Sequence, residues 1–235
     1  MLKVSRQPDG RPEIFHSIQG EGVYAGKPAV FLRLALCNLA CVWCDTRYTW
    51  DWEHYDQRKE VVTISVDEAE EEIRRFDCRN LVVTGGEPLV QQRALVTLLE
   101  RLKGSGFWIE VETNGTIVPG KKWLGLVDHW SVSPKLENSG NPPSLRENAR
   151  ALRLFRDLPP AHFKFVIEKA DDLAELRGML EKYEIPAKKV VLMPQARNAV
   201  ALLEKSRWLV DACKSEGYLF STRLQILLWG NRRGV

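Results

Sequence analysis

Short apolar runs alternate along the chain with segments of helical periodicity. The expected strands are runs of apolar and β-branched residues bounded by turn residues, at 29–36, 81–84, 107–112, 127–132, 163–167, 190–193 and 224–228. The expected helices repeat apolar positions every three or four residues, at 66–76, 89–103, 171–183 and 199–216, with another that starts at Ser144 and Glu147. The pattern therefore predicts alternating strands and helices.

Residues at the ends of these helices support the assignment. Ser65 and Glu68 are spaced as a capping box at the start of the helix at 66–76. Gly104 and Gly217 follow two other helices, where a residue that tolerates positive φ can end the helix. Residues 114–126 include three glycines and a proline, so we expect one crossover helix to be missing there.

Alternation of this kind predicts an α/β fold, because a crossover helix returns each strand parallel to its neighbour. A complete eightfold barrel takes about 250 residues. This chain has 235 residues and its first 28 lie outside the alternation, so we expect a partial or modified (β/α) barrel. We expect a single domain over 1–235, with an N-terminal extension at 1–28, an insertion at 43–62 and a C-terminal strand and tail at 217–235.

Composition narrows the class of protein. Hydrophobic residues make up 44% and charged residues 28%, which is typical of a folded globular chain. The net charge of +3 is too small to indicate a nucleic-acid or membrane partner. The sequence contains no run of about 18 apolar residues and no apolar segment behind its N-terminal charges, so we expect a cytoplasmic protein.

The most informative feature is a group of three cysteines directly after the first predicted barrel strand. Cys37, Cys41 and Cys44 are close enough in sequence to bind one metal centre, and three ligands leave a position open. Two alternatives are a structural zinc site completed by Cys78 or Cys213, and a helix with the three cysteines on one face. The spacing favours iron and sulfur, because structural zinc usually takes its ligands from separate short knuckles.

A second motif follows the strand at 81–84. Thr84, Gly85, Gly86, Glu87 and Pro88 lead from its end into a helix. Two glycines at a strand end allow the backbone to approach a ligand closely. Taken alone, the segment could equally be a tight turn with proline at the start of a helix.

Together these motifs resemble the radical S-adenosylmethionine (SAM) superfamily. The C-x-x-x-C-x-x-C run with Trp43 before its last cysteine is similar to the signature that binds three irons of a [4Fe-4S] cluster. The Gly85-Gly86-Glu87 segment resembles the superfamily motif that contacts the amino group of SAM. The resemblance implies a cluster whose fourth iron binds SAM and whose electron cleaves it to a 5′-deoxyadenosyl radical.

From Ile14 to the C-terminus the chain resembles one family, the 7-carboxy-7-deazaguanine synthases. The similar segments are 18–22, 31–33, 44–46, 131–135, 163–165, 193–195 and 229–235. The family converts 6-carboxy-5,6,7,8-tetrahydropterin to 7-carboxy-7-deazaguanine with loss of ammonia, on the path to queuosine and related deazapurines. The resemblance implies Mg²⁺, a homodimer and an electron donor such as flavodoxin or ferredoxin.

The resemblance also implies roles for individual residues. Thr46 would bind Mg²⁺. The expected SAM-binding residues are Trp43, Gly85, Gly86, Glu87, Ser133, Pro134, Lys135 and Gln195. The expected substrate-binding residues are Ile18, Gln19, Gly20, Glu21, Arg33, Thr84 and Val235.

Some of these roles have a physical basis and an alternative. A carboxylated pterin needs a cationic fork, which Arg33 can supply, and partners for its amide edge, which Gln19 and Glu21 can supply. The alternatives are that Arg33 belongs to an ordinary ion pair, that Thr46 caps a turn, and that Val235 ends a frayed tail.

The chain departs from the family pattern at two positions. Leu36 stands where glycine is common, and Gln225 stands where histidine is common in the last strand. We expect the first change to affect packing only, and the second puts an acid–base role at that position in doubt.

Two other functions compete with this one. A glycyl-radical-enzyme activase carries the same cysteine run and acts on a protein, but it does not need the 19–21 loop or the 229–235 tail. A non-catalytic zinc or RNA-binding module would use Arg232, Arg233 and exposed tryptophans, and would bind zinc without iron.

Overall fold

The computed structural model describes residues 1–235 and contains a 10-stranded sheet. The strands are β1 (Leu2–Ser5), β2 (Ile14–Ile18), β3 (Pro28–Leu34), β4 (Val61–Ile64), β5 (Asn80–Gly85), β6 (Trp108–Thr113), β7 (His129–Val132), β8 (Ala161–Ile167), β9 (Val190–Pro194) and β10 (Leu219–Phe220). The helices are α1 (Gln57–Glu60), α2 (Val66–Arg74), α3 (Gln92–Gly104), α4 (Lys121–Leu126), α5 (Pro143–Arg146), α6 (Ala149–Asp157), α7 (Asp172–Tyr183), α8 (Ala199–Glu216) and α9 (Leu224–Trp229).

The sheet is a parallel series extended by antiparallel strands at one edge. β3, β5, β6, β7, β8, β9 and β10 pair in that order and run parallel. β1 and β2 both pair with β3 in the antiparallel sense, and β4 pairs with β1. β10 and β4 lie at the two ends of the series and do not pair with each other, so the sheet stays open. The prediction of an α/β fold with a partial barrel is confirmed.

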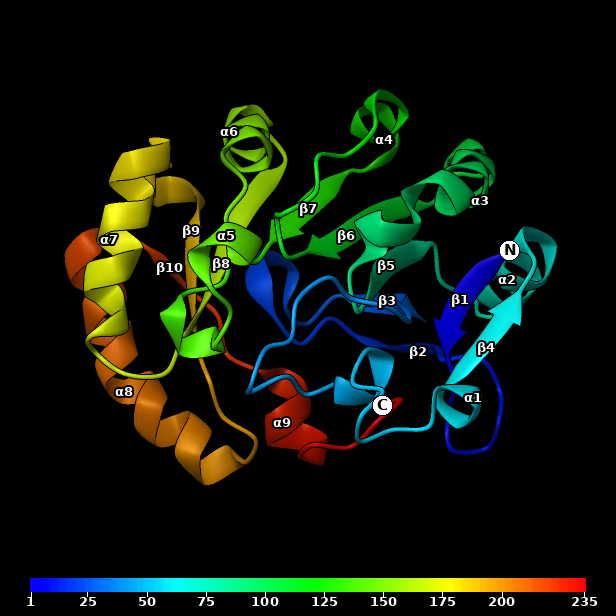
Figure 1. Ribbon diagram of the computed structural model, residues 1–235, viewed down its shortest axis with the longest axis horizontal. Helices are drawn as coiled ribbons and strands as arrows, with labels where there is room; N and C mark the ends of the chain where they lie inside the picture. Colours follow the sequence, from blue (N-terminus) through cyan, green and yellow to red (C-terminus); the bar gives the residue numbers. More distant parts are fainter.

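The helices lie outside the sheet and leave its inner side to the site. Figure 1 shows α8, α7, α6, α4, α3 and α2 as an arc around the strands, with α9 and the C-terminus on the open side. Ile109 and Val111 of β6 belong to the core against the helices, as do Phe163 and Phe165 of β8. Since side chains alternate along a strand, the residues between them face inward. Those residues include charged ones.

The structure corrects the sequence prediction in four places. Residues 224–228 were expected to be a strand and form α9 instead, whose Ile226 packs on Leu202 of α8. The crossover after β6 keeps a helix of six residues, α4, where none was expected. The third predicted helix, expected to start at Ser144, is split into the short α5, which contains Ser144, and α6, which Asn148 caps. The strands β1, β2, β4 and β10 were not predicted.

None of the helices combines the length and the apolar character needed to cross a membrane.

The capping box of α2 gives a test of the local energetics. Ser65 Oγ accepts a hydrogen bond from the Glu68 backbone N–H, and the Glu68 carboxylate accepts one from the Ser65 backbone N–H. We expect Ser65→Ala to lower the free energy of unfolding by about 1 kcal/mol in urea denaturation, because it removes the cap. Ser215→Ala is the control, since that hydroxyl bonds only its own helix. Equal stability of the two variants would contradict the prediction.

Candidate active site

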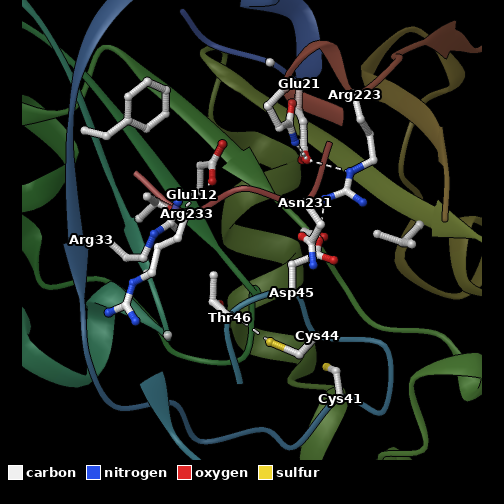
Figure 2. A pocket seen from close by; sticks show the side chains of 18 of the residues that line it. Glu21, Arg33, Cys41, Cys44, Asp45, Thr46, Glu112, Arg223, Asn231 and Arg233 are labelled. Atoms are coloured by element: carbon white, nitrogen blue, oxygen red, sulfur yellow. Dashed lines mark hydrogen bonds and ion pairs between the residues drawn. The ribbon is translucent and has the colours of Figure 1, made fainter. Parts of the chain in front are cut away.

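One cavity of about 520 Å³ opens at the carboxyl ends of the parallel strands. Its volume lies in the range of small-molecule sites. The cavity brings together segments from the whole length of the chain, including the 18–21 loop, the cysteine loop, the end of β5 and the last residues of the chain. Figure 2 shows side chains from the 18–21 loop, the cysteine loop and the last residues of the chain around the same space.

The three cysteines lie in the loop after β3, not in a helix, which excludes the helical alternative. Each sulfur accepts an N–H from this chain. The backbone N–H of Leu39 donates to Cys37 Sγ (3.5 Å), and the side-chain amide of Asn141 donates to Cys41 Sγ (3.3 Å). The indole N–H of Trp50 donates to Cys44 Sγ (3.4 Å), so each sulfur has its own donor. Hydrogen bonds of this kind are typical of thiolates that hold iron–sulfur clusters.

The donor set fits an iron–sulfur cluster better than a zinc ion. No group of three or more His, Cys, Asp or Glu side chains is arranged to hold a single ion. Cys78 bonds the carbonyls of Pro28 and Asn80, and Cys213 bonds that of Leu219, so neither completes a zinc site. Burial raises the pKa of the Cys37 thiol to about 12. A bound metal would oppose this shift, because its positive charge stabilises the thiolate.

The end of β5 is packed too closely against the cysteine loop for any side chain at Gly85 or Gly86. A Cβ at Gly85, where φ is +134°, would lie 2.1 Å from the Leu34 carbonyl oxygen. A Cβ at Gly86 would lie 2.0 Å from that of Leu36. The absence of side chains at these glycines therefore allows the two motifs to pack together, whereas the approach to a ligand that the sequence predicted stays a prediction.

Glu87 has a different environment from the one expected. Its carboxylate is buried and does not line the cavity. It accepts the backbone N–H of Asn114 (2.7 Å) and Leu89 (3.0 Å) and the hydroxyl of Thr113 (2.8 Å). Burial raises its pKa, partly offset by these bonds. Its side chain thus joins the β5 turn to the end of β6, and Pro134 also lies outside the cavity lining.

Gln19 and Thr84 are oriented by two carboxylates of β6. The Gln19 amide donates to Glu110 Oε1 (3.1 Å) and Glu112 Oε1 (3.2 Å), and Thr84 Oγ1 donates to Glu112 Oε2 (2.7 Å). The Gln19 carbonyl oxygen accepts the Glu21 N–H (3.2 Å). The side-chain amide of Gln19 therefore bonds to other residues of the chain. Of the two β6 carboxylates, Glu112 lines the cavity and Glu110 does not.

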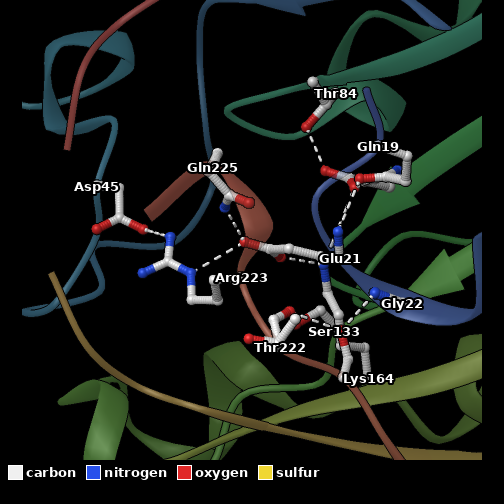
Figure 3. Close-up of polar contacts among 12 residues, drawn as sticks. Gln19, Glu21, Gly22, Asp45, Thr84, Ser133, Lys164, Thr222, Arg223 and Gln225 are labelled. Carbon is white, nitrogen blue, oxygen red and sulfur yellow. Dashed lines mark hydrogen bonds and ion pairs between the residues drawn. The ribbon is translucent and has the colours of Figure 1, made fainter. Parts of the chain in front are cut away.

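Glu21 is the centre of a buried ion network, seen in Figure 3. Its Oε2 accepts from Lys164 Nζ (2.6 Å), and its Oε1 accepts from Arg223 Nε (3.0 Å) and Gln225 Nε2 (2.7 Å). Arg223 also pairs with Asp45 beside the last cysteine. The network ties the 18–21 loop to β8, to α9 and to the cysteine loop.

The charges in this network stabilise one another. Burial alone would raise the pKa of Glu21, but the opposite charges of Lys164 and Arg223 outweigh it and hold that pKa well below its usual range. Burial also opposes the charge on Lys164, yet Glu21 and Glu112 keep the pKa of Lys164 above its usual range. Both groups are therefore ionised at neutral pH.

Arg33 is held in an ion pair and still has free donors. Its Nε donates to Glu13 Oε1 (2.8 Å), while its two terminal nitrogens make no hydrogen bond within the chain. The ion pair that was the alternative role for Arg33 is therefore present, and it leaves the two terminal nitrogens free. Arg33 lines the cavity, so these nitrogens are available to a ligand there. Figure 2 shows Arg33 beside Arg233 and near Thr46.

Sequence reasoning assigned no role to several charged residues of the site. These are Glu13, Asp45, Glu112, Lys164 and Arg223, all of which line the cavity, as does Arg233, which was considered only for a zinc or RNA-binding module. A signal existed for Glu112 and Lys164, because each is a charged residue inside a short apolar strand. Alternation along β6 and β8 would have directed both to the inner face.

Comparisons with known proteins agree with this geometry. The sequence model of the Radical SAM superfamily matches residues 34–130, which contain the cysteines and the Gly85-Gly86 turn. A 7-carboxy-7-deazaguanine synthase from Pyrobaculum aerophilum is 39% identical over 94% of this chain and 95% of its own length. Another, from Rhodopirellula baltica, is 34% identical over 95% of this chain and 87% of its own. The chain belongs to the 7-carboxy-7-deazaguanine synthase family.

Solved structures support the same assignment. The crystal structure of QueE from Escherichia coli matches with a TM-score of 0.70 and 25% identity over 95% of this chain and 94% of that one. The structure of SuiB from Streptococcus suis bound to S-adenosylmethionine shares the fold, with a TM-score of 0.54 at 14% identity over 82% of this chain and 51% of that one. Family membership removes the support for an activase or a binding module.

The structure explains the two departures from the family pattern. Leu36 has a φ of +73°, the left-handed region that favours glycine, so this change affects the backbone and not only packing. Bonds from the Leu36 N–H to Thr49 O and from the Glu87 N–H to Leu36 O hold it there, at 2.8 Å each. Gln225 lies in α9 and not in a strand, and it donates to Glu21.

The Glu21 network gives a pH-dependent test. Lys164→Met leaves a buried carboxylate with one cation fewer, so we expect the free energy of unfolding to fall by about 3 kcal/mol at pH 7. The deficit should shrink below about pH 4.3, where the unfolded wild-type chain takes up a proton at Glu21 that its folded form does not bind.

Urea denaturation at pH 7 and pH 3.5 measures both effects. Lys182→Met is the matched control, because that lysine pairs with Glu147 but is mostly exposed, and it should cost less than about 1 kcal/mol. A Lys164→Met deficit that does not change with pH would contradict the account of Glu21.

Proposed function

We propose that this chain converts 6-carboxy-5,6,7,8-tetrahydropterin to 7-carboxy-7-deazaguanine with release of ammonia. The observation that carries the proposal is one cavity with three hydrogen-bonded cysteine sulfurs and an arginine whose fork is open, in a chain of this family. The substrate minus one ammonia has the composition of the product, so the reaction needs no net oxidant.

In this proposal Cys37, Cys41 and Cys44 hold a [4Fe-4S] cluster that binds SAM. The bound cluster supplies an electron that cleaves SAM and so starts the radical reaction. The exposed Val42 between two of the cysteines is 63% accessible, and an electron donor such as flavodoxin or ferredoxin would approach the cluster there. We also propose that two copies of this chain form a homodimer.

Lys135 is the best candidate for the carboxylate of SAM. Its Nζ donates to Ser133 Oγ (2.8 Å) and lies 5.5 Å from the ring centroid of Trp43, and it has no carboxylate partner in the chain. A half-buried ammonium without a counter-charge favours an anionic ligand. Ser133, Trp43 and Gln195 line the same cavity, and the Gly85-Gly86 backbone would offer close approach to the amino group.

Arg33 is the proposed clamp for the pterin carboxylate. Glu13 fixes its Nε, so the two terminal nitrogens present a preformed pair of donors to a carboxylate. Thr84, Ile18, Gly20 and the ordered loop of Gln19 and Glu21 would surround the ring, and the Val235 carboxylate would reach it from the tail. These roles rest on position in the cavity and on resemblance to the family.

Thr46 is proposed to hold Mg²⁺ together with the substrate carboxylate. Its hydroxyl lies 3.6 Å from Cys44 Sγ and lines the cavity. A single neutral hydroxyl binds Mg²⁺ only with help from substrate oxygens and waters. We therefore expect Thr46→Val to abolish any stimulation by Mg²⁺, measured as turnover with and without added MgCl₂. Equal stimulation of variant and wild type would contradict this role.

The direct test of the proposed function is anaerobic turnover by the reconstituted protein. The mixture contains SAM, dithionite, Mg²⁺ and 6-carboxytetrahydropterin, and mass spectrometry follows the products. We expect a product lighter than the substrate by one ammonia. Formation of 5′-deoxyadenosine without that product would retain the radical chemistry and contradict the substrate assignment.

Arg33→Lys tests the carboxylate clamp. Lysine keeps the positive charge but loses the planar pair of donors, so we expect turnover to fall by about a hundredfold while SAM affinity changes less than about twofold. Steady-state rates and equilibrium dialysis with labelled SAM measure the two effects. Arg11→Lys, in an exposed pair with Asp9, is the control and should match wild type. Unchanged turnover in Arg33→Lys would remove the role.

A further inference from the structure

Three distant parts of the chain meet at the buried carboxylate of Glu13. Its Oε1 accepts from Arg33 Nε (2.8 Å) and from the Tyr48 hydroxyl (3.1 Å). Its Oε2 accepts from Arg233 Nε (3.0 Å), three residues from the C-terminal end. The Glu13 side chain has no exposed surface, so all of its charge is balanced within this group. A fully buried carboxylate is costly unless it is paired in this way.

All three nitrogens of the Arg233 guanidinium donate hydrogen bonds. Besides Glu13, it donates from Nη1 to Glu60 Oε2 (2.8 Å) and from Nη2 to the backbone carbonyl of Arg6. Its central carbon lies 3.5 Å from the ring centroid of Tyr48, which is the geometry of a cation–π contact. The planar fork of arginine suits several fixed acceptors at once, and lysine could not serve them all.

The rest of the tail has no other polar attachment. Within residues 231–235 only Arg233 makes a hydrogen bond or an ion pair, and no backbone hydrogen bond joins the segment to the body of the protein. The neighbouring Arg232 is exposed and has no partner. Yet these last residues line the cavity. A chain end is ordinarily poorly ordered unless something holds it.

We propose that Arg233 is a positioning residue that latches the C-terminal tail over the cavity. Through Glu13 the same latch fixes the Arg33 guanidinium, so the tail and the proposed carboxylate clamp share one anchor. Release of Arg233 would free the tail and leave Arg33 as the only arginine paired with Glu13. The identity of the substrate rests on the proposed function, whereas the latch itself does not.

The first test measures the tail without substrate. Carboxypeptidase digestion followed by mass spectrometry gives the rate at which residues are removed from the C-terminus. We expect Arg233→Ala to be trimmed at least about tenfold faster than wild type. Arg232→Ala is the matched control in the same tail and should be trimmed at the wild-type rate. Equal trimming of Arg233→Ala and wild type would overturn the latch.

Glu60→Gln tests the latch from outside the cavity. Because it replaces the negative charge that pairs with Arg233 by a neutral amide and leaves Glu13 unchanged, we expect trimming at a rate between those of wild type and Arg233→Ala. When Glu60→Gln is added to Arg233→Ala, the trimming rate should not rise further, because the two residues act as one pair. Additive effects would contradict the latch, and thermal unfolding of each variant shows that the chain remains folded.

Kinetics separate a positioning role from a structural one. We expect Arg233→Ala to raise KM for 6-carboxytetrahydropterin at least about tenfold, with Arg233→Lys in between and SAM affinity unchanged. An unchanged KM in a variant that is trimmed rapidly would contradict the link between tail and clamp. If wild type does not turn over the pterin, the proposed function fails while the trimming result still decides the latch.

Discussion

The site depends on the requirement that every buried charge has a partner. Two carboxylates, Glu13 and Glu21, lie deep in the open end of the barrel, and each is held between cations from distant parts of the chain. Removing one partner from such a group costs several kcal/mol, because the remaining charge stays buried. The two networks therefore fix the substrate loop, the cysteine loop, α9 and the tail relative to the parallel strands.

This arrangement also decides which groups are left for ligands. Arg223, Arg233 and Lys164 pair with carboxylates of the chain. The terminal nitrogens of Arg33 and the Nζ of Lys135 have no carboxylate partner. The Arg33 fork and the Lys135 ammonium match the two carboxylates that the proposed reaction brings, one on SAM and one on the pterin. Donors fixed before binding lose little entropy when a ligand arrives, which favours both affinity and precise placement.

Much of the fold could be predicted from the sequence, because its elements are marked by local signals. The capping box at Ser65, the glycine at 217 and the apolar strands 81–84 and 163–167 all correspond to elements of the structure. The apolar run at 224–228 was misassigned, since a short apolar run does not distinguish a strand from a helix by its period. Its true contact is with Leu202 of α8, and no local signal specifies it.

For the candidate site, the cysteines and the double glycine were evident because their chemistry lies within a few residues of sequence. The ion networks were not, since Glu13 meets Arg233 across almost the whole chain. Pairing at that distance depends on β2 lying beside β3 and on the path of the tail, which only the folded chain defines.

The central claim is that the cavity is built to receive a small ring through its carboxylate. The most direct measurement is anaerobic calorimetry on the SAM-loaded protein, comparing 6-carboxytetrahydropterin with tetrahydropterin that lacks the carboxyl group. Two charge-assisted hydrogen bonds from Arg33 predict an affinity about a hundredfold higher for the carboxylated ligand. Affinities within about threefold of each other would contradict the account.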